Sequence, residues 1–205
     1  MADKPGDFFV GVIDFFGILL PGAILLFLDG DLLSRALALP GTTEGTARWV
    51  VFCVASYVLG HFVVAASVKL NDLHSVYRSE SNDPFYNEVK DKISLPANLP
   101  KNRSNAFYRA FAFVRLKSPA GLIEIERQMA EYKLFRSLVL VFAFDFLISL
   151  LTHKAPWRQA LSILLSVGAL WRFVYLLNWT RRITFEYYAL LHSNGSGDTR
   201  DPLIE

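Results

Sequence analysis

The stretch Gly11–Leu28, GVIDFFGILLPGAILLFL, combines the composition of a membrane span with two features that a span does not need. About 20 apolar residues in a helix cross a hydrocarbon layer roughly 30 Å thick. This stretch also contains a carboxylate, Asp14, and a helix breaker, the pair Pro21-Gly22. Because hydrocarbon disfavours a charge and an unpaired backbone carbonyl, these residues are expected to contact other parts of the protein.

Four runs of the chain have the length and apolar character of a transmembrane helix. They are residues 8–28, 49–68, 134–151 and 160–179. Of the 205 residues, 53% are hydrophobic and 17 are phenylalanine, which is more apolar than a soluble domain of this size usually is. Buried core helices of a soluble protein are the alternative, but the chain is too short to cover four of them. We therefore expect an all-α polytopic membrane protein with four transmembrane helices.

Basic residues predict the orientation of these spans, because they are enriched on the cytoplasmic side. Segment 69–133 carries eleven Lys and Arg, whereas segment 29–48 carries two Arg and three acids. The pair Arg181-Arg182 follows the fourth span. Segment 69–133 and both termini are therefore expected in the cytoplasm. A signal peptide is a competing interpretation of the first span, but two acids and one lysine precede it, and its apolar run is longer than usual.

The cytoplasmic part is expected to be helical and to comprise segments 69–133 and 180–205. Ser118-Pro119 has the pattern of an N-cap followed by proline at the first helical position. No breaker follows within the next turns, so one helix is predicted from Pro119 to Leu151, which includes the third span. The chain after the fourth span is expected to continue as a helix that packs against it, and Ser193–Glu205 to be a disordered tail.

Ahead of that helix, segment 105–117 mixes aromatic and basic residues at helical spacing. Such a helix suits the membrane surface, or it packs on cytoplasmic neighbours; both interpretations stay open. The residues expected on its basic and aromatic face are Phe107, Arg109, Phe111, Arg115 and Lys117. The arginine in the first turn of the third span, Arg136, is expected to extend to the lipid headgroups.

Three ionisable residues on different spans lie at similar depth. Counting inward from the cytoplasmic ends at 1.5 Å per residue places Asp14, His61 and Arg172 roughly 10–12 Å below the inner surface. This predicts one intramembrane polar layer with an Asp14–Arg172 pair. The layer is either a structural device that makes burial tolerable or part of a gate or water-filled path.

Two further features of the spans have alternative interpretations. Asp145 lies deeper, in the middle of the third span, and no cation of comparable depth is apparent. Such an acid is protonated, bonded to hydroxyl groups, or exposed to water, and copies of it in an oligomer would form an acidic ring. The pair Pro21-Gly22 frees a carbonyl and allows close backbone approach, so it predicts either a packing kink or a functional break, which would be a hinge or line a pore.

Motifs for known catalytic chemistry are absent from the sequence. There is no H-E-x-x-H zinc motif, no G-x-S-x-G nucleophile motif and no phosphate-binding G-x-x-x-x-G-K. The formal net charge of +2 provides no large field for nucleic acid. We expect a protein that is not an enzyme and that uses no cofactor and no metal.

Two segments, DFFGILLPGAILL at 14–26 and AEYKLFRSLVLVF at 130–142, together with the four-span layout, carry a resemblance. The chain resembles small four-span bacterial membrane proteins of antiphage defence systems, of the Kiwa type or the accessory membrane components of CRISPR loci. The resemblance implies a multi-pass protein of the bacterial inner membrane. It transfers no catalytic residue.

Three functional hypotheses follow. The first is a non-enzymatic membrane effector that oligomerises and forms a pore or perturbs the bilayer, under the control of its cytoplasmic helices and a soluble protein partner. Small residues in the spans would support its oligomerisation. These are Gly60, Ala65, Ala66, Gly168 and Ala169. The second is a membrane anchor or sensor that recruits a soluble partner without conducting, and the third is a membrane enzyme acting on lipid.

Overall fold

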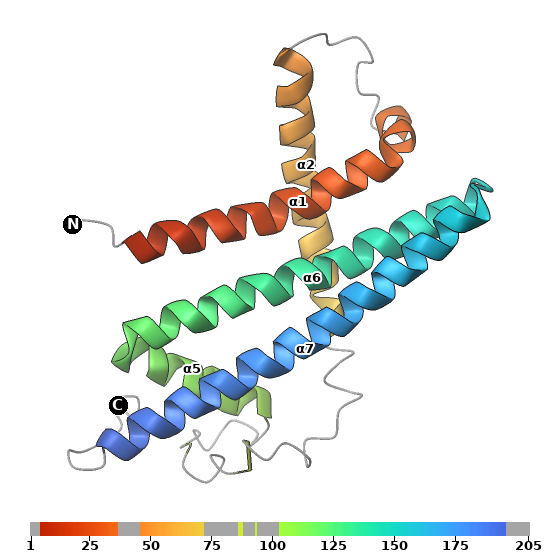
Figure 1. Cartoon of the computed structure of the whole chain (residues 1–205). Coiled ribbons are helices and arrows are strands. Elements are labelled where there is room, and N and C mark those ends of the chain that lie inside the picture. The colour runs from red at the N-terminus through yellow and green to blue at the C-terminus, as the bar shows by residue number, and fades with distance from the viewer. Residues whose placement is uncertain (1–4, 37–45, 72–85, 88–92, 94–102, 196–205) are drawn as a thin grey trace. The chain divides into compact units, whose positions relative to one another are not determined.

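In the computed structural model, every regular element within the described residues is a helix (Figure 1). The described residues are 5–36, 46–71, 86–87, 93 and 103–195, and for 5–14, 31–36, 46–48, 103 and 194–195 only the backbone is described. The main helices are α1 (Pro5–Ala36), α2 (Thr46–Ser67), α5 (Arg103–Lys117), α6 (Pro119–Leu151) and α7 (Pro156–Gly195). The predicted all-α class is confirmed.

Three helices are long and apolar enough to cross a membrane. They are Trp49–Asn71, Pro119–Leu151 and Pro156–Ser193. Only 17%, 39% and 28% of their most apolar stretches are buried within the protein. Apolar helix surfaces that remain so exposed indicate a membrane-embedded protein. The first predicted span lies in α1, whose apolar part within the described side chains, Phe15–Gly30, is shorter than a span.

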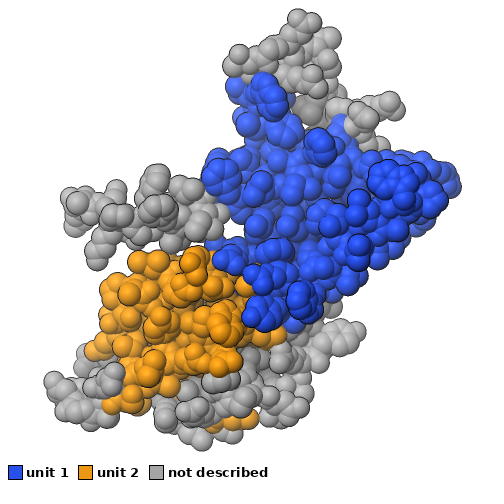
Figure 2. Space-filling view, in the orientation of Figure 1, with its two compact units in different colours: residues 1–74, 130–175 blue, residues 75–129, 176–205 orange. Residues whose placement is uncertain are grey.

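The chain divides into two compact units, which are coloured separately in Figure 2. Unit 1 comprises residues 1–74 and 130–175, and unit 2 comprises residues 75–129 and 176–205. The helices α6 and α7 therefore each contribute one part to unit 1 and another part to unit 2.

The start of α6 is fixed by the predicted cap. The Ser118 hydroxyl accepts a hydrogen bond from the Gly121 N–H at 3.2 Å, and the Ser118 carbonyl accepts the first backbone bond, from Leu122, at 3.0 Å. Pro119, which has no N–H to leave unpaired, occupies the first helical position. The predicted helix from Pro119 to Leu151 is confirmed at both ends.

The end of α6 is closed by a Schellman motif that begins the turn into α7. His153 adopts a positive φ of 51°, and its N–H bonds the Leu150 carbonyl at 3.3 Å. The Lys154 N–H reaches back to the Ser149 carbonyl at 2.9 Å. These two bonds satisfy carbonyls that the helix end leaves free. Since α7 begins at Pro156, the turn is short and returns the chain antiparallel to α6 (Figure 1).

Within unit 1, α1 and α2 cross with their backbones in close contact. A Cβ atom added to Gly22 would lie 1.8 Å from the Ser56 carbonyl oxygen, and one added to Gly60 would lie 2.0 Å from the Ile18 carbonyl oxygen. Only glycine fits at either position, because real Cβ atoms do not approach backbone this closely. The prediction that Gly22 permits close approach of another backbone is confirmed, and Pro21 beside it is fully buried.

Unit 2 has a core of aromatic and aliphatic side chains from α5, the first part of α6 and the last part of α7. Val114, Ile125 and Phe185 are fully buried in it. The rings of Phe113 and Tyr188 pack edge to face, with centroids 5.0 Å apart. The prediction that the chain after residue 180 continues as a helix and packs against the start of α6 is confirmed. The packed interpretation of α5 is also favoured over a surface helix.

The α1–α2 crossing predicts a steep sensitivity at its two glycines. Gly22→Ala and Gly60→Ala should each lower the free energy of unfolding by about 1–3 kcal/mol or more, because the added methyl group meets backbone that has no room to move. SDS-induced unfolding in mixed micelles measures the change. Gly17→Ala is the matched control in the same helix, since nothing lies within 4 Å of a Cβ there. It should be neutral or stabilise by up to about 1 kcal/mol. Equal stability of Gly22→Ala and Gly17→Ala would show that the helices do not cross at Gly22.

Candidate functional site

A charged cluster joins α1 to the α6–α7 turn in unit 1. Its carboxylates are Asp29, at a bend in α1, and Asp145, on α6. Its cations are Lys154, in the turn, and Arg158, in the first turn of α7. Ser162, one turn further along α7, completes the group. Asp29 is far in sequence from the other four residues, which lie within segment 145–162.

The contacts within the cluster form a continuous chain. The Lys154 Nζ lies 2.9 Å from Asp29 Oδ1. The Arg158 Nη2 lies 3.6 Å from the same oxygen and 2.8 Å from Asp145 Oδ1. The Ser162 hydroxyl donates to the other Asp145 oxygen. Arg158 is thus shared between the two carboxylates, and Lys154 is paired with one of them.

The bend in α1 presents Asp29 to this cluster. Asp29 has φ of −129° and ψ of 25°, which interrupts the helical backbone, although the chain is helical on both sides. A break of this kind leaves carbonyl groups of the preceding turn without their helical partners. One of them, the carbonyl of Leu28, accepts a hydrogen bond from Arg158 Nη2. Arg158 therefore binds both the backbone and the side chain at the bend.

The two carboxylates of the cluster are buried, so they require charged partners. The side chains of Asp29 and Asp145 are 0% and 3% exposed, whereas those of Lys154 and Arg158 are 27% and 28% exposed. A buried carboxylate without a partner is strongly unfavourable, and two acids with two bases leave the cluster neutral. Asp29 Oδ2 and Arg158 Nε are buried and have no hydrogen-bond partner among the described residues. The charges of the site are thus paired, although these two atoms have no hydrogen bond among the described residues.

The chemistry of the cluster is electrostatic. Among the residues that the structure describes, there is no group of three or more His, Cys, Asp or Glu side chains arranged to hold a metal ion. Two carboxylates bridged by a guanidinium connect the helices, and the Ser162 hydroxyl is hydrogen-bonded to one of these carboxylates. What the arrangement can do is hold the end of α1 against the α6–α7 turn and release it when the ion pairs separate.

Asp145 is the predicted site residue that takes part, and the expectation about its surroundings was wrong. No cation of comparable depth was expected, yet Arg158 is an ion-pair partner and Ser162 a hydrogen-bond donor. The depth estimate considered cations inside the spans. Arg158 lies just before the fourth predicted span, and a long flexible side chain carries its charge several ångströms along the helix. Bonding to a hydroxyl group, one of the three alternatives for Asp145, is confirmed.

The predicted polar layer of Asp14, His61 and Arg172 stays a prediction. The Asp14 side chain lies outside the described residues, so its pairing with Arg172 is not tested. His61 is exposed on α2 and packs edge to face on Tyr57, with ring centroids 4.6 Å apart. The Arg172 guanidinium lies 5.8 Å from the ring centroid of Phe135 and 5.5 Å from that of Tyr175. These aromatic faces already provide Arg172 with a favourable environment.

The pair Pro21-Gly22 belongs to the α1–α2 crossing, and the residue with non-helical dihedral angles in α1 is Asp29. On α5, the expected basic and aromatic face is divided by burial. Phe107 is buried in the unit 2 core, so it does not present a surface. Phe111 and Arg109 are half-buried, and Arg115 and Lys117 are exposed.

Arg136 behaves differently from the expectation that it extends to the headgroups. It is 5% exposed, and its Nε donates to the Ser67 hydroxyl of α2 at 3.0 Å. Ser137, its neighbour on α6, has its hydroxyl 3.4 Å from that of Ser67. The hydrogen bond to the Ser67 hydroxyl of α2 therefore holds the Arg136 Nε inside the protein.

Sequence reasoning missed Asp29, Lys154 and Arg158 as site residues. A signal was present, because all three lie at span ends that the predicted topology places on one side of the membrane. Asp29 follows the first predicted span, and the other two lie in the short connection between the third and fourth. The missing information was the bend in α1, which no sequence pattern indicated.

The cluster predicts strong energetic coupling between Asp145 and Arg158. Asp145→Leu and Arg158→Leu should each destabilise the protein, because each leaves a charge without its partner. The loss of unfolding free energy in the double variant should be smaller, by about 1–3 kcal/mol, than the sum of the losses in the two single variants. SDS-induced unfolding of the four proteins in the cycle provides the coupling energy. The exposed pair Arg182–Glu186 of unit 2 is the matched control, with an expected coupling of about 0.5 kcal/mol or less. Additive effects at Asp145 and Arg158 would contradict the pairing.

Comparison of the chain with models of protein families, with curated proteins and with solved structures finds no match in any of the three. What the protein does is therefore inferred from its own residues and their geometry.

Proposed function

We propose that the protein is a non-enzymatic, oligomeric membrane effector of the bacterial inner membrane, which forms a pore or perturbs the bilayer when its cytoplasmic helices receive a signal. In this proposal α1 provides a fourth span, over residues 8–28, beside the three helices that are long enough to cross. Antiviral defence is the proposed context, and it rests on the resemblance of segments 14–26 and 130–142 alone.

The observation that carries this proposal is the continuity of α6 and α7 between the two units. Each helix is unbroken from the unit 2 core to the charged cluster of unit 1. From Met129 to Asp145 the α6 axis rises roughly 24 Å at 1.5 Å per residue. A rigid helix transmits a displacement over such a distance without needing a chain of side-chain contacts. Movement of unit 2 residues would therefore reach Asp145 and Arg158.

The charged cluster is the element that this movement would switch. Arg158 already contacts both Asp29 and Asp145, so a small shift of α7 relative to α6 would favour one carboxylate over the other. Loss of the Asp29 contacts would free the end of α1 from the α6–α7 turn. In this proposal the cluster has a second arrangement, in which Arg158 keeps Asp145 and releases Asp29, so the response would be a switch rather than a gradual deformation.

The proposed topology places the charged cluster near the outer surface of the membrane. Segment 69–133 carries eleven Lys and Arg, and the pair Arg181-Arg182 follows the fourth predicted span, so these parts are assigned to the cytoplasm with both termini. Asp29 and Lys154 would then lie near the outer surface. Exposed apolar side chains of α2, such as Val54, Val58 and Phe62, would contact lipid or other copies.

A second candidate is a membrane anchor or sensor that recruits a soluble partner without conducting. A specific observation favours it: unit 2 has its own core and yet exposes large apolar side chains. Tyr108 and Leu116 of α5 are 66% and 59% exposed. If unit 2 lies in the cytoplasm, such residues are suited to a protein partner.

Ion flux through proteoliposomes tests the effector proposal directly. Asp29→Asn keeps the shape of the side chain and removes the charge that Lys154 pairs with. Liposomes that contain this variant should therefore release a trapped ion or dye several-fold faster than those with the wild type. Glu186→Gln is the matched control, because it removes the acid of an exposed ion pair in unit 2 and should leave the flux unchanged.

Absence of flux from both the wild type and Asp29→Asn would refute the pore and favour the anchor. Support for the anchor would then come from capture of a soluble protein that depends on Tyr108 and Leu116 and is insensitive to Asp29→Asn. Equal flux from Glu186→Gln and Asp29→Asn would mean that the cluster is not the switch.

A further inference from the structure

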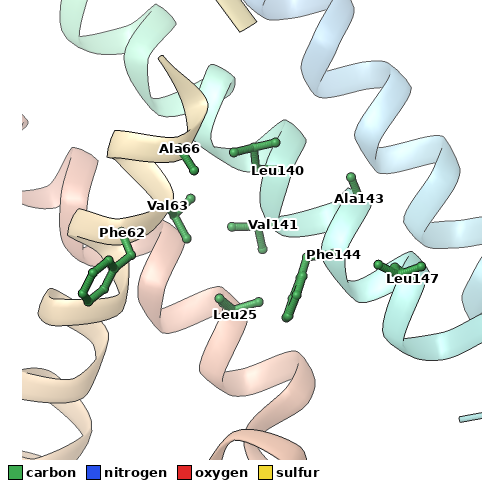
Figure 3. A pocket seen from close by; sticks show the side chains of 9 residues that line it. All are labelled: Leu25, Phe62, Val63, Ala66, Leu140, Val141, Ala143, Phe144 and Leu147. Carbon is green, nitrogen blue, oxygen red and sulfur yellow. The ribbon is translucent and has the colours of Figure 1, made fainter. Parts of the chain in front are cut away.

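An apolar groove of about 410 Å³ lies in unit 1 between α1, α2 and α6. Figure 3 shows Val63 and Ala66 of α2 facing Leu140 and Val141 of α6, with Leu25 of α1 nearby. Every residue that lines the groove is apolar. Phe62 and Ala66 are exposed, so the groove opens onto the surface of the unit rather than being enclosed.

A buried cation lies one helical turn beyond this groove. On α6, residues 136, 140 and 144 share one face, because residues four apart are neighbours on a helix. On α2, Val63 and Ser67 have the same relationship. Arg136 therefore lies one turn from Leu140 of the groove, and Ser67 lies one turn from Val63. Because Arg136 and Ser67 contact each other, both lie beyond the same end of the groove. The separation is about one turn, or 5.4 Å along each axis.

Arg136 is only partly satisfied by its neighbours. Its Nε donates to Ser67, and the Ser67 and Ser137 hydroxyls themselves donate to the carbonyls of Val64 and Lys133. Among the described residues, no carboxylate pairs with Arg136. The hydrogen bond that Arg136 makes among the described residues uses Nε, so its two terminal nitrogens are the donors that this proposal assigns to a ligand, and an anion with several oxygens matches the planar guanidinium.

We propose that the groove and Arg136 together bind one anionic phospholipid, with an acyl chain along the groove and the phosphate on the Arg136 guanidinium. The unit that contains the groove has apolar, exposed helices, so acyl chains are the molecules that would fill an apolar groove on its surface. Arg136 lies in the first turn of the third predicted span, residues 134–151, and because its side chain is 5% exposed, the headgroup phosphate in this proposal enters between α2 and α6 to reach it. A bound lipid would then connect α2 to α6. These two helices also contact each other through Ser67 of α2 and the neighbours Arg136 and Ser137 of α6.

The test measures lipid retention by the full-length protein. Purified protein in a neutral detergent is titrated with phosphatidylglycerol or phosphatidylcholine, and bound lipid is counted by native mass spectrometry. One phosphatidylglycerol should be retained about tenfold more tightly than phosphatidylcholine, as expected for a charge-assisted contact whose headgroup carries net charge. Arg136→Gln should remove this preference, and Arg136→Lys should keep part of it. Arg127→Gln removes an equal charge from an exposed pair and should change nothing.

A second pair of variants tests the groove. Ala66→Phe fills it and should weaken retention of both lipids, whereas Ala65→Phe adds the same ring to an exposed neighbour that does not line the groove. The melting temperature of each variant shows whether it is folded. The charge variants and the groove variants test the proposal independently. If Arg136→Gln does not fold, the result for Ala66→Phe still decides, and the reverse also holds.

Three outcomes overturn the proposal. The first is equal retention of the two lipids by the wild type. The second is retention that Arg136→Gln and Ala66→Phe, both folded, leave unchanged. The third is full displacement of the lipid by millimolar inorganic phosphate, which would identify a site for free phosphate. None of these measurements depends on whether the protein conducts ions.

Discussion

The burial of two carboxylates beside the α6–α7 turn is the constraint on which the rest of unit 1 depends. Asp29 and Asp145 are almost completely shielded, so they must be paired, and the pairing cations come from the turn and from the start of α7. That requirement brings the bend of α1, the end of α6 and the start of α7 to one place. A neutral cluster of this kind is compatible with an apolar surrounding, whereas any single member is not.

A second constraint operates where α1 crosses α2. At Gly22 and Gly60 the backbones of these helices are in direct contact, so the fit at the crossing depends on the absence of a side chain at both positions. The two constraints differ in what would disturb them. The crossing has no room for a side chain at either glycine, while the charged cluster has a buried oxygen and a buried N–H that have no hydrogen-bond partner among the described residues. In the proposed function, α1 is the helix that a signal would move, because it is joined to the rest of unit 1 by the crossing and by the ion-pair cluster.

Sequence reasoning predicted the helices well and the site only in part. Ser118-Pro119 and the uninterrupted run after it defined α6 to the residue, because capping and breaker chemistry act within a few positions. Asp145 was identified because an acid in an apolar run is unfavourable without a partner. Its partner Arg158 was missed, and so was the burial of Arg136, because both depend on which helices are neighbours and how far a long side chain reaches. The bend at Asp29 was equally invisible, since a single aspartate after an apolar run is typical of a span end.

The proposed function joins these elements: a cytoplasmic unit with its own core, two continuous helices, and a charged cluster that holds α1. Its central structural claim is the Asp29–Lys154 contact, and zero-length cross-linking of the wild type with a carbodiimide tests it most directly. The reagent converts a carboxylate and an amine in contact into an amide, and mass spectrometry identifies the two peptides joined. Because Nζ and Oδ1 are 2.9 Å apart, the account predicts a peptide that links Asp29 to Lys154, and its absence in Lys154→Arg, which keeps the charge but not the amine. A Lys154 that stays unlinked, or that links to a different carboxylate, would contradict the account.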